Sequence, residues 1–301
     1  MPLEPVGPLL ARARREGYAV GYFESWNLES LQGVVDAAEA TRSPIILGFN
    51  GDFLSRSTRR TDERIAWYAA LGRAAAESAS VPCGLIFNEC PRDEWVRAAI
   101  SAGFNLVMPA DPSASLAEST YRVTALARLA HERSVAVEAE VGELPCGVGD
   151  LAGEHGALTD PETAAAFVAA TGVDLLAVSV GNVHIKTRGE QALDLDRLAA
   201  IRQRVAIPLV LHGGTGIDAA SLREAIALGV AKVNYGTYLK QRYLRAVRAA
   251  LAHDPEDPHR LLGLGGPDDV LVAGRLAVRD AVLERIGWLG CCGKADVREA
   301  L

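Results

Sequence analysis

The sequence lacks several features that would assign it to a particular class of protein. No apolar stretch is long enough to cross a membrane, and the N-terminus lacks the apolar core of a signal peptide. Cysteine is scarce, and an odd number without a short repeating spacing argues against a disulfide framework; the residues are Cys83, Cys90, Cys146, Cys291 and Cys292. The net charge of −7 disfavours a nucleic-acid partner. We therefore expect a cytoplasmic protein with reduced thiols and neither a membrane nor a nucleic-acid partner.

The sequence does contain a long alternation of short apolar runs and helical segments. With 301 residues, of which 49% are apolar, the chain can bury a large core in one barrel or in two domains. Eight strand candidates cover 18–23, 45–47, 81–87, 104–108, 135–139, 174–180, 207–211 and 230–233. Most of the segments between them carry apolar residues at the spacing of a helix. A G-x-G-x-x-G motif is missing after the first candidate, which disfavours a dinucleotide-binding sheet. The pattern predicts one domain over residues 1–301, folded as a single (β/α)8 TIM barrel.

Polar side chains follow most of the predicted strands. In a parallel barrel the carboxyl ends of all strands share one face, where ligands bind. The residues expected at this mouth are Glu24, Asn50, Asn88, Glu89, Asp111, Glu140, His184, His212 and Asn234. Two histidines and several carboxylates suit a divalent ion such as Zn, Mn, Fe, Co or Ni. The alternative for each residue is a hydrogen bond at the barrel rim.

The loops after the last two predicted strands are rich in glycine. Residues 213–216 and 234–237 precede helical segments, so their backbone N–H groups could bind a phosphate. Glycine also lets a ligand approach the backbone closely, although simple turn geometry would explain the same residues. A further glycine-rich loop covers 142–156, and its length and composition predict a mobile lid.

In order and spacing, several segments resemble the class II, metal-dependent ketose-bisphosphate aldolases, which act on fructose or tagatose bisphosphate. The likeness spans nearly the whole chain; the segments are Asn27-Leu28-Glu29, 43–46, 137–142, 158–161, 171–178 and 208–216. The resemblance implies a TIM barrel, a dimer or tetramer, and a zinc-like ion held by three histidines. Two of these histidines correspond to His184 and His212. Phosphate and substrate contacts correspond to Gly213, Thr215, Asn234 and Thr237.

The sequence departs from the family where the third predicted strand ends. The family has His-x-Asp-His there, in which the Asp is the catalytic acid/base and the second His is a metal ligand. This chain has Ile86-Phe87-Asn88-Glu89. Asn88 cannot exchange a proton near neutral pH, so the family's usual mechanism fails at this position. Glu89 can still bind a metal through oxygen, which gives Glu89, His184 and His212 as the predicted ligands.

Other departures surround this position. Phe23-Glu24 stands where the family has Phe-Asn, Ile185 where it has Gly, and Gly236 where it has Asp. The family's catalytic glutamate in the lid aligns with residues 147–150. Acid/base chemistry would therefore fall to Glu24, Glu89 or Glu140.

The sequence predicts a divergent, metal-dependent carbon–carbon lyase of carbohydrate metabolism. Its substrate would be a ketose phosphate or a related sugar, and its metal ion would be zinc. The protein would assemble as a homodimer or homotetramer. Two alternatives stay open at this stage. One is a non-catalytic barrel that binds a sugar phosphate, and the other is an isomerase or epimerase with the same enediolate chemistry. The loss of the family's acid at Asn88 favours the non-catalytic alternative, whereas Asn88, Glu24 and Glu140 are the candidate catalytic positions of the lyase.

Overall fold

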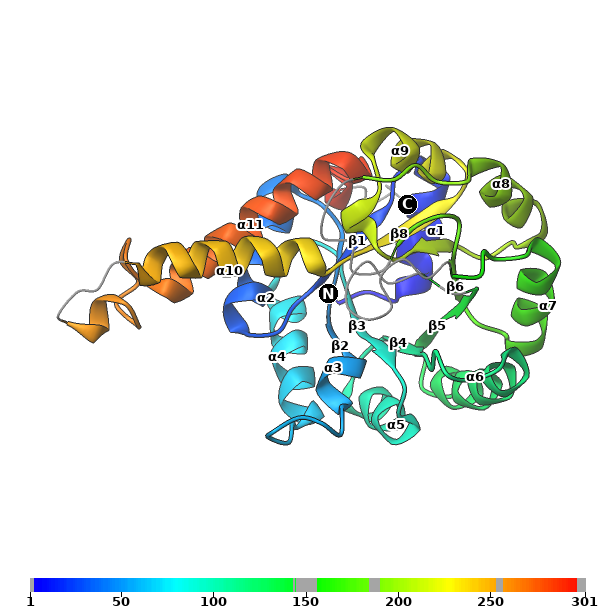
Figure 1. Ribbon diagram of the computed structural model, residues 1–301, viewed down its shortest axis with the longest axis horizontal. Coiled ribbons are helices and arrows are strands. Elements are labelled where there is room, and N and C mark those ends of the chain that lie inside the picture. Colours follow the sequence, from blue (N-terminus) through cyan, green and yellow to red (C-terminus); the bar gives the residue numbers. More distant parts are fainter. Residues whose placement is uncertain (1–2, 143, 145–155, 184–189, 253–256, 297–301) are drawn as a thin grey trace.

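The computed structural model describes residues 3–142, 144, 156–183, 190–252 and 257–296, and within them eight parallel strands close into a barrel (Figure 1). Each strand pairs with its neighbours in chain order, and β1 pairs with β8. The strands are β1 Val20–Glu24, β2 Ile45–Asn50, β3 Cys83–Cys90, β4 Leu106–Pro109, β5 Ala136–Val141, β6 Leu175–Val178, β7 Leu209–Leu211 and β8 Val230–Tyr235. The (β/α)8 prediction is confirmed.

Helices alternate with the strands and cover the outside of the barrel. They are α1 Val6–Glu16, α2 Leu28–Thr41, α3 Gly51–Ser55, α4 Ile65–Ser78, α5 Asp93–Ala102, α6 Leu116–His131, α7 Pro161–Thr171, α8 Leu195–Arg204, α9 Ala219–Ala227, α10 Thr237–Leu251 and α11 Val270–Leu289. Three short 3-10 helices are η1 Gly214–Gly216, η2 Pro258–Arg260 and η3 Lys294–Asp296. Among the described residues, no helix is both long and apolar enough to span a membrane.

Burial on both faces explains the apolar runs that predicted the strands. Every residue of β2 and of β8 is buried, because one face packs in the barrel and the other against helices. The register aligns the polar ends of neighbouring strands: Asn50 pairs with Asn88, and Tyr22 pairs with Asn234. The strand ends therefore bring polar side chains from distant parts of the chain to one mouth.

Local capping sets most helix starts. Asp160 accepts a hydrogen bond at the start of α7, and Asp218 does so at the start of α9, as their positions before helical segments predict. The sequence offers Thr61 or Asp62 as the cap of the helix that follows them. This prediction is wrong, because α4 begins later and its N-cap is Arg64, which makes no side-chain cap bond. A buried apolar face therefore fixes α4 without help from a cap.

The segment after β2 also differs from the prediction. From the sequence alone, a strand at 45–47 followed by a loop at 48–51 is expected; instead β2 continues to Asn50 and Gly51–Ser55 forms the short helix α3. The side chain of Asn50 accepts a hydrogen bond from the backbone N–H of Phe53 at 3.0 Å, which starts this helix. Asn50 is thus held in place at the mouth by the turn that follows it.

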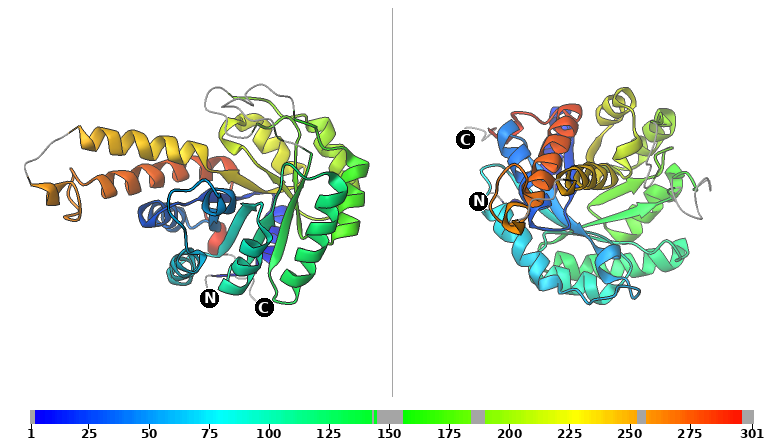
Figure 2. Two further views of the ribbon diagram at one scale, coloured as in Figure 1. Left: turned by 60° about the horizontal axis from the view of Figure 1, so that its bottom comes forward. Right: turned by 60° about the vertical axis from the view of Figure 1, so that its left-hand side comes forward.

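Helices α10 and α11 form an antiparallel pair that extends beyond the barrel (Figures 1 and 2). They approach closely, since a Cβ atom on Gly274 would lie 2.3 Å from the ring of Tyr243. Arg275 joins α11 to α2 through two hydrogen bonds to Asp36, at 2.6 and 2.7 Å. This arm exposes a series of large apolar side chains: Leu244, Leu251, Leu262, Leu264 and Leu276.

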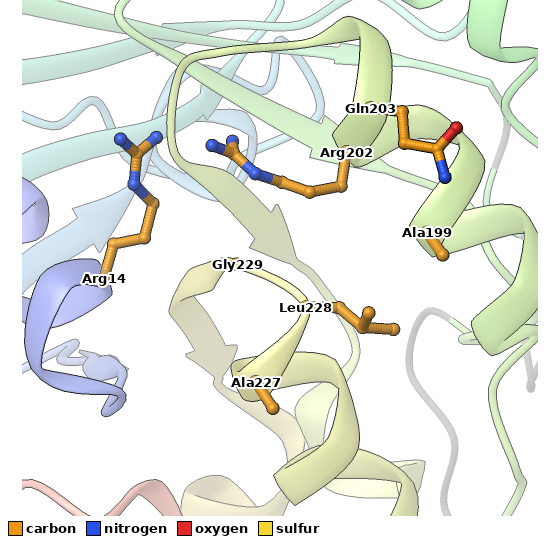
Figure 3. Close-up of a pocket in the computed structure, with 7 residues that line it drawn as sticks. All are labelled: Arg14, Ala199, Arg202, Gln203, Ala227, Leu228 and Gly229. Atoms are coloured by element: carbon orange, nitrogen blue, oxygen red, sulfur yellow. The ribbon is translucent and has the colours of Figure 1, made fainter.

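A cavity of about 330 Å³ lies at the end of the barrel where the strands begin. The guanidinium groups of Arg14 and Arg202 point toward one another across it (Figure 3). Both donate to the carbonyl oxygen of Ala206, and Arg202 also donates to that of Val205 at 2.9 Å. These arginines satisfy carbonyl groups just after the end of α8, so their role is structural. The cavity lies away from the mouth.

Candidate active site

His212 lies at the end of β7, where it contacts two carboxylates. It is 1% exposed. Its Nε2 atom is 2.8 Å from Glu138 Oε1, and its Nδ1 atom is 2.9 Å from Glu89 Oε1. Asn182 fixes the backbone here by donating a hydrogen bond to the carbonyl oxygen of His212 at 3.0 Å. Side chains from the ends of three strands therefore meet at one imidazole. Of these, the sequence predicted His212 and Glu89 at the mouth.

A buried lysine extends this chain of contacts into the barrel. The Nζ atom of Lys232 is 2.8 Å from Glu138 Oε2, and both side chains are fully buried. Lys232 also donates to Asn234 Oδ1 at 2.6 Å and lies over the ring of Tyr22 at 5.3 Å. Sequence reasoning missed Lys232. The available signal was a lysine inside an otherwise apolar strand.

The charges in this chain depend on one another. Burial alone would raise the pKa of Glu138, but Lys232 and His212 bring it below its ordinary value. Burial lowers the pKa of Lys232, against the opposing effect of Glu138. Burial would also lower the pKa of His212, but contacts with Glu138 and Glu89 raise it to about 10. The Glu138 carboxylate is therefore ionised, and it lies between the Lys232 ammonium and the His212 ring.

Glu89 has an unusual backbone conformation. Its φ angle of 52° lies in the left-handed region, and the β3–β4 register shifts between Phe87 and Cys90. Asn50 donates a hydrogen bond from Nδ2 to Glu89 Oε2 at 2.8 Å. Such strain in a non-glycine residue persists only where the surroundings hold it, and it is concentrated at functional sites. The irregular strand end turns the Glu89 carboxylate toward His212.

Several buried polar atoms at the mouth have no hydrogen-bond partner among the described residues. They include the amide oxygen of Asn88, the amide nitrogen of Asn234 and the hydroxyl of Tyr22. Burial raises the pKa of Tyr22 well above its ordinary value, and the charges of Glu24, Glu89 and Glu138 add to this effect. Buried polar groups are normally satisfied, so these atoms indicate the place of a polar ligand.

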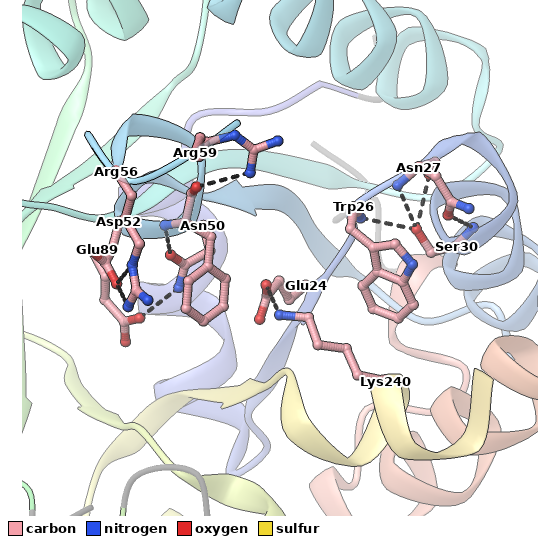
Figure 4. Close-up of polar contacts among 11 residues, drawn as sticks. Glu24, Trp26, Asn27, Ser30, Asn50, Asp52, Arg56, Arg59, Glu89 and Lys240 are labelled. Atoms are coloured by element: carbon pink, nitrogen blue, oxygen red, sulfur yellow. Dashed lines mark hydrogen bonds and ion pairs between the residues drawn. The ribbon is translucent and has the colours of Figure 1, made fainter. Parts of the chain in front are cut away.

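Glu24 lies at the end of β1 and pairs with Lys240 of α10 (Figure 4). Lys240 was not among the predicted site residues, because its helix position gives no hint that it reaches the mouth. Glu140, at the end of β5, lies near enough to contribute to the raised pKa of His212. Both Glu24 and Glu140 are thus at the mouth where the sequence placed them.

The two glycine-rich loops meet beside the site. Gly213 has a φ angle of 65°, which favours glycine, and η1 follows it directly. A Cβ atom on Gly214 would lie 2.9 Å from the carbonyl oxygen of Asn234, so the loops touch. The backbone N–H of Tyr238, next to Thr237, donates to Thr215 Oγ1 at 3.2 Å. The four predicted phosphate-contact positions are therefore neighbours in space.

The contacts of His212 are those of a histidine that could bind a metal. A histidine that binds a metal usually donates its other ring N–H to a carboxylate, which is how Nε2 of His212 meets Glu138. Nδ1 makes no hydrogen bond of good geometry within the described ranges, and it faces Glu89. No group of three His, Cys, Asp or Glu side chains suited to a metal occurs among the described residues, and His184 lies outside them, as does most of the predicted lid.

Three comparisons with known proteins agree with one another. The model of the family described as fructose-bisphosphate aldolase class-II matches residues 5–294. The chain is 35% identical over 300 residues to the fructose-bisphosphate aldolase of Geobacillus stearothermophilus, covering 98% of this chain and 99% of that protein. Its fold is similar to the crystal structure of the YdjI aldolase from Escherichia coli K12, with a TM-score of 0.80, 30% identity, and coverage of 98% and 100% of the two chains.

Proposed function

The chain belongs to the class II fructose-bisphosphate aldolase family and is an aldolase-type carbon–carbon lyase, and from this premise we propose that it cleaves a ketose phosphate with the help of a zinc ion. The family is divalent-metal dependent. The observation that carries the proposal is the position of His212 at the mouth, with Glu138 on one ring nitrogen and Glu89 beside the other. Glu89, His184 and His212 would hold the ion.

The bound ion would supply Lewis-acid polarisation of the substrate carbonyl. The protein supplies the rest. Glu138, supported by Lys232, orients His212. The loops at Gly213, Thr215, Asn234 and Thr237 would bind the phosphate through backbone N–H groups and side-chain donors, and the adjacent helix start favours an anion. Asn88 can hydrogen-bond a substrate oxygen but cannot accept its proton.

Aldol cleavage requires a base and an acid. The base removes the proton of the C4 hydroxyl while the C3–C4 bond breaks, which leaves an aldehyde and an enolate. An acid then returns a proton to C3. We assign these steps to Glu24 and Glu140, because both lie at the mouth and Asn88 cannot perform them.

The assembly and location belong to the same proposal. The leucines exposed along α10, α11 and the intervening segment support a homodimer or homotetramer, since an apolar series on an extended arm favours burial against another copy. The described cysteines Cys83, Cys90, Cys291 and Cys292 are free thiols, which supports a cytoplasmic location.

We expect the purified protein to hold about one divalent ion per chain and to cleave a ketose 1-phosphate or 1,6-bisphosphate, with the activity lost in chelator and restored by zinc. Elemental analysis and a coupled assay for the triose phosphate product measure the two quantities. Analysis of the sugar products separates cleavage from epimerisation at the same carbon. Ketose turnover without carbon–carbon cleavage products, or activity that survives removal of the ion, would contradict the proposal.

Replacing Asn88 with aspartate is expected to leave fructose 1,6-bisphosphate cleavage inefficient. The change places an acid/base group where the family has one, but Glu24 and Gly236 still differ from the family pattern around it. The measurement is kcat/KM for this substrate in the wild type and in Asn88→Asp. A large rise in the single variant would show that the other departures do not limit the reaction.

A further inference from the structure

Arg285 of α11 is a buried cation that the proposed mechanism does not use. Its side chain is 6% exposed. Two of its guanidinium nitrogens, Nε and Nη1, are buried and have no hydrogen-bond partner within the described part of the chain. Its Nη2 atom lies 3.7 Å from Glu284 Oε1, and the Glu284 side chain is 43% exposed to solvent. Burying a charge without a close countercharge costs free energy, so other groups around Arg285 must compensate for it.

The guanidinium of Arg285 lies over three aromatic rings. Its Cζ atom is 3.9 Å from the ring centre of Trp288, 4.3 Å from that of Tyr238 and 5.9 Å from that of Tyr235. Tyr235 ends β8, and Tyr238 lies in the first turn of α10. Because a cation attracts the faces of aromatic rings, Arg285 holds both ends of the loop between β8 and α10 against α11.

The same two tyrosines contact the other predicted phosphate loop, Gly213–Gly216. The backbone N–H of Tyr238 donates a hydrogen bond to Thr215 Oγ1 at 3.2 Å. A Cβ atom on Gly214 would lie 2.8 Å from the Tyr235 ring, so the backbone of this loop packs directly on that ring. A displacement of either tyrosine would therefore change how the two loops meet.

The positive charge of Arg285 also acts on these tyrosines. Burial raises the pKa of the Tyr235 hydroxyl above its ordinary value, and Arg285 opposes this rise. Burial and Glu284 raise the pKa of Tyr238, and Arg242 and Arg285 oppose that rise. The positive potential of Arg285 thus extends to both ends of the loop between β8 and α10, and it is weakly screened because the guanidinium is buried. An anion bound by this loop would be stabilised by the potential.

We propose that Arg285 is a positioning residue for phosphate binding. Through Tyr235 and Tyr238 it holds the loop at Asn234–Thr237 against the loop at Gly213–Gly216, and its buried charge favours a phosphate bound by the two loops. Arg285 acts through the two rings and does not touch the substrate. This inference rests on the proposed function, in which these loops bind the phosphate of the substrate.

Binding of inorganic phosphate to the purified protein, followed by phosphorus NMR titration, tests this role without catalysis. Arg285→Met removes the charge and should raise the Kd of phosphate by about tenfold, whereas Arg285→Lys keeps the charge and should stay within about threefold of the wild type. Arg279→Met is the matched control, because Arg279 is a partly exposed arginine of the same helix that pairs with Asp280 at 2.8 Å. It should leave the Kd unchanged.

Two substitutions at Tyr238 test the route through the ring, and they remain informative if Arg285→Met does not fold. Tyr238→Leu keeps Arg285 but removes the ring at 4.3 Å, so it should raise the Kd of phosphate by about threefold or more. Tyr238→Phe keeps the ring and removes only the hydroxyl that donates to Glu284 at 2.6 Å, so its Kd should match that of the wild type. Equal losses in these two variants, or an unchanged Kd in both Arg285→Met and Tyr238→Leu, would overturn the inference.

The kinetics of cleavage distinguish a role in phosphate binding from a general loosening of the site. In Arg285→Met the KM for fructose 1-phosphate should rise by about the same factor as the Kd of phosphate, while kcat and the metal content stay within about twofold of the wild type. A fall in kcat or in metal content as large as the loss of phosphate affinity would show that Arg285 supports the whole site, and would overturn the inference.

The same measurements separate this inference from the proposed function. Weaker phosphate binding by Arg285→Met, in a protein that cleaves no ketose phosphate, would refute the lyase and support the role of Arg285. Cleavage by the wild type, with phosphate affinity unchanged in both Arg285→Met and Tyr238→Leu, would support the lyase and refute the role of Arg285. A wild type that cleaves the sugar but binds no inorganic phosphate would likewise refute only the role of Arg285.

Discussion

Replacing His212 with alanine is expected to release the bound ion and to lower kcat/KM for ketose phosphate cleavage by about 10³-fold or more, since metal-ion polarisation supplies several kcal/mol of transition-state stabilisation. His212 is the described residue at which the contacts of the site converge, with Glu138 at 2.8 Å and Glu89 at 2.9 Å. Elemental analysis of the purified variant and a coupled cleavage assay measure the two effects.

Two further variants test whether loss of the ion causes the lower kcat/KM of His212→Ala. Glu138→Gln keeps the imidazole but weakens the group that orients it, so metal affinity should fall by about 10–100-fold. His131→Ala removes a histidine that pairs with Asp174 at a surface site, and it should leave both metal content and activity unchanged. A His212→Ala protein that is folded by circular dichroism and retains a full equivalent of ion would refute the site assignment.

Replacing Lys232 with methionine is expected to lower the free energy of unfolding by about 3–5 kcal/mol, the usual effect of removing one partner of a buried ion pair. Lys232 and Glu138 are both fully buried and their charged atoms are 2.8 Å apart. Without the ammonium, the carboxylate loses the cation that offsets its desolvation, and the Asn234 side chain loses a donor at 2.6 Å. Urea unfolding followed by circular dichroism measures the change.

A surface lysine gives the matched control for this experiment. Lys294 pairs with Glu16 at 3.3 Å with both side chains partly exposed, so Lys294→Met should cost at most about 1 kcal/mol. Adding Glu138→Gln to Lys232→Met should restore part of the loss, because the buried charge is then gone as well. If Lys232→Met were as stable as the control, the buried pair would not support the barrel core.

The strands and most helices followed from the sequence because their signals are local. The run Ile45–Leu47 is apolar throughout, and strand β2 forms there with both faces buried. Asp160 before Pro161 predicted the start of α7, and the structure confirms it. The start of α4 was predicted wrongly, since no local cap fixes it at Arg64 and packing against the barrel decides where the helix begins.

The site was predictable only in part. The strand-end positions of Glu24, Glu89 and His212 follow from the alternation of strands and helices, which brings every strand end to one face. The roles of Lys232 and Lys240 did not follow, because each reaches the site from a strand or helix whose pattern does not indicate its partner. Likewise, the left-handed conformation of Glu89 depends on a shift in β3–β4 register that involves two separate segments.

The sequence by itself determined the barrel, the family and the strand-end positions of Glu24, Glu89 and His212, because periodicity, helix caps and motif order are properties of short stretches of chain. Only the tertiary structure decided which of those residues face one another. The chain Lys232–Glu138–His212–Glu89 joins strands β8, β5, β7 and β3, and Glu24 lies beside Gly236 across the closure of β1 and β8. Such contacts depend on strand register and burial, which arise when the barrel closes.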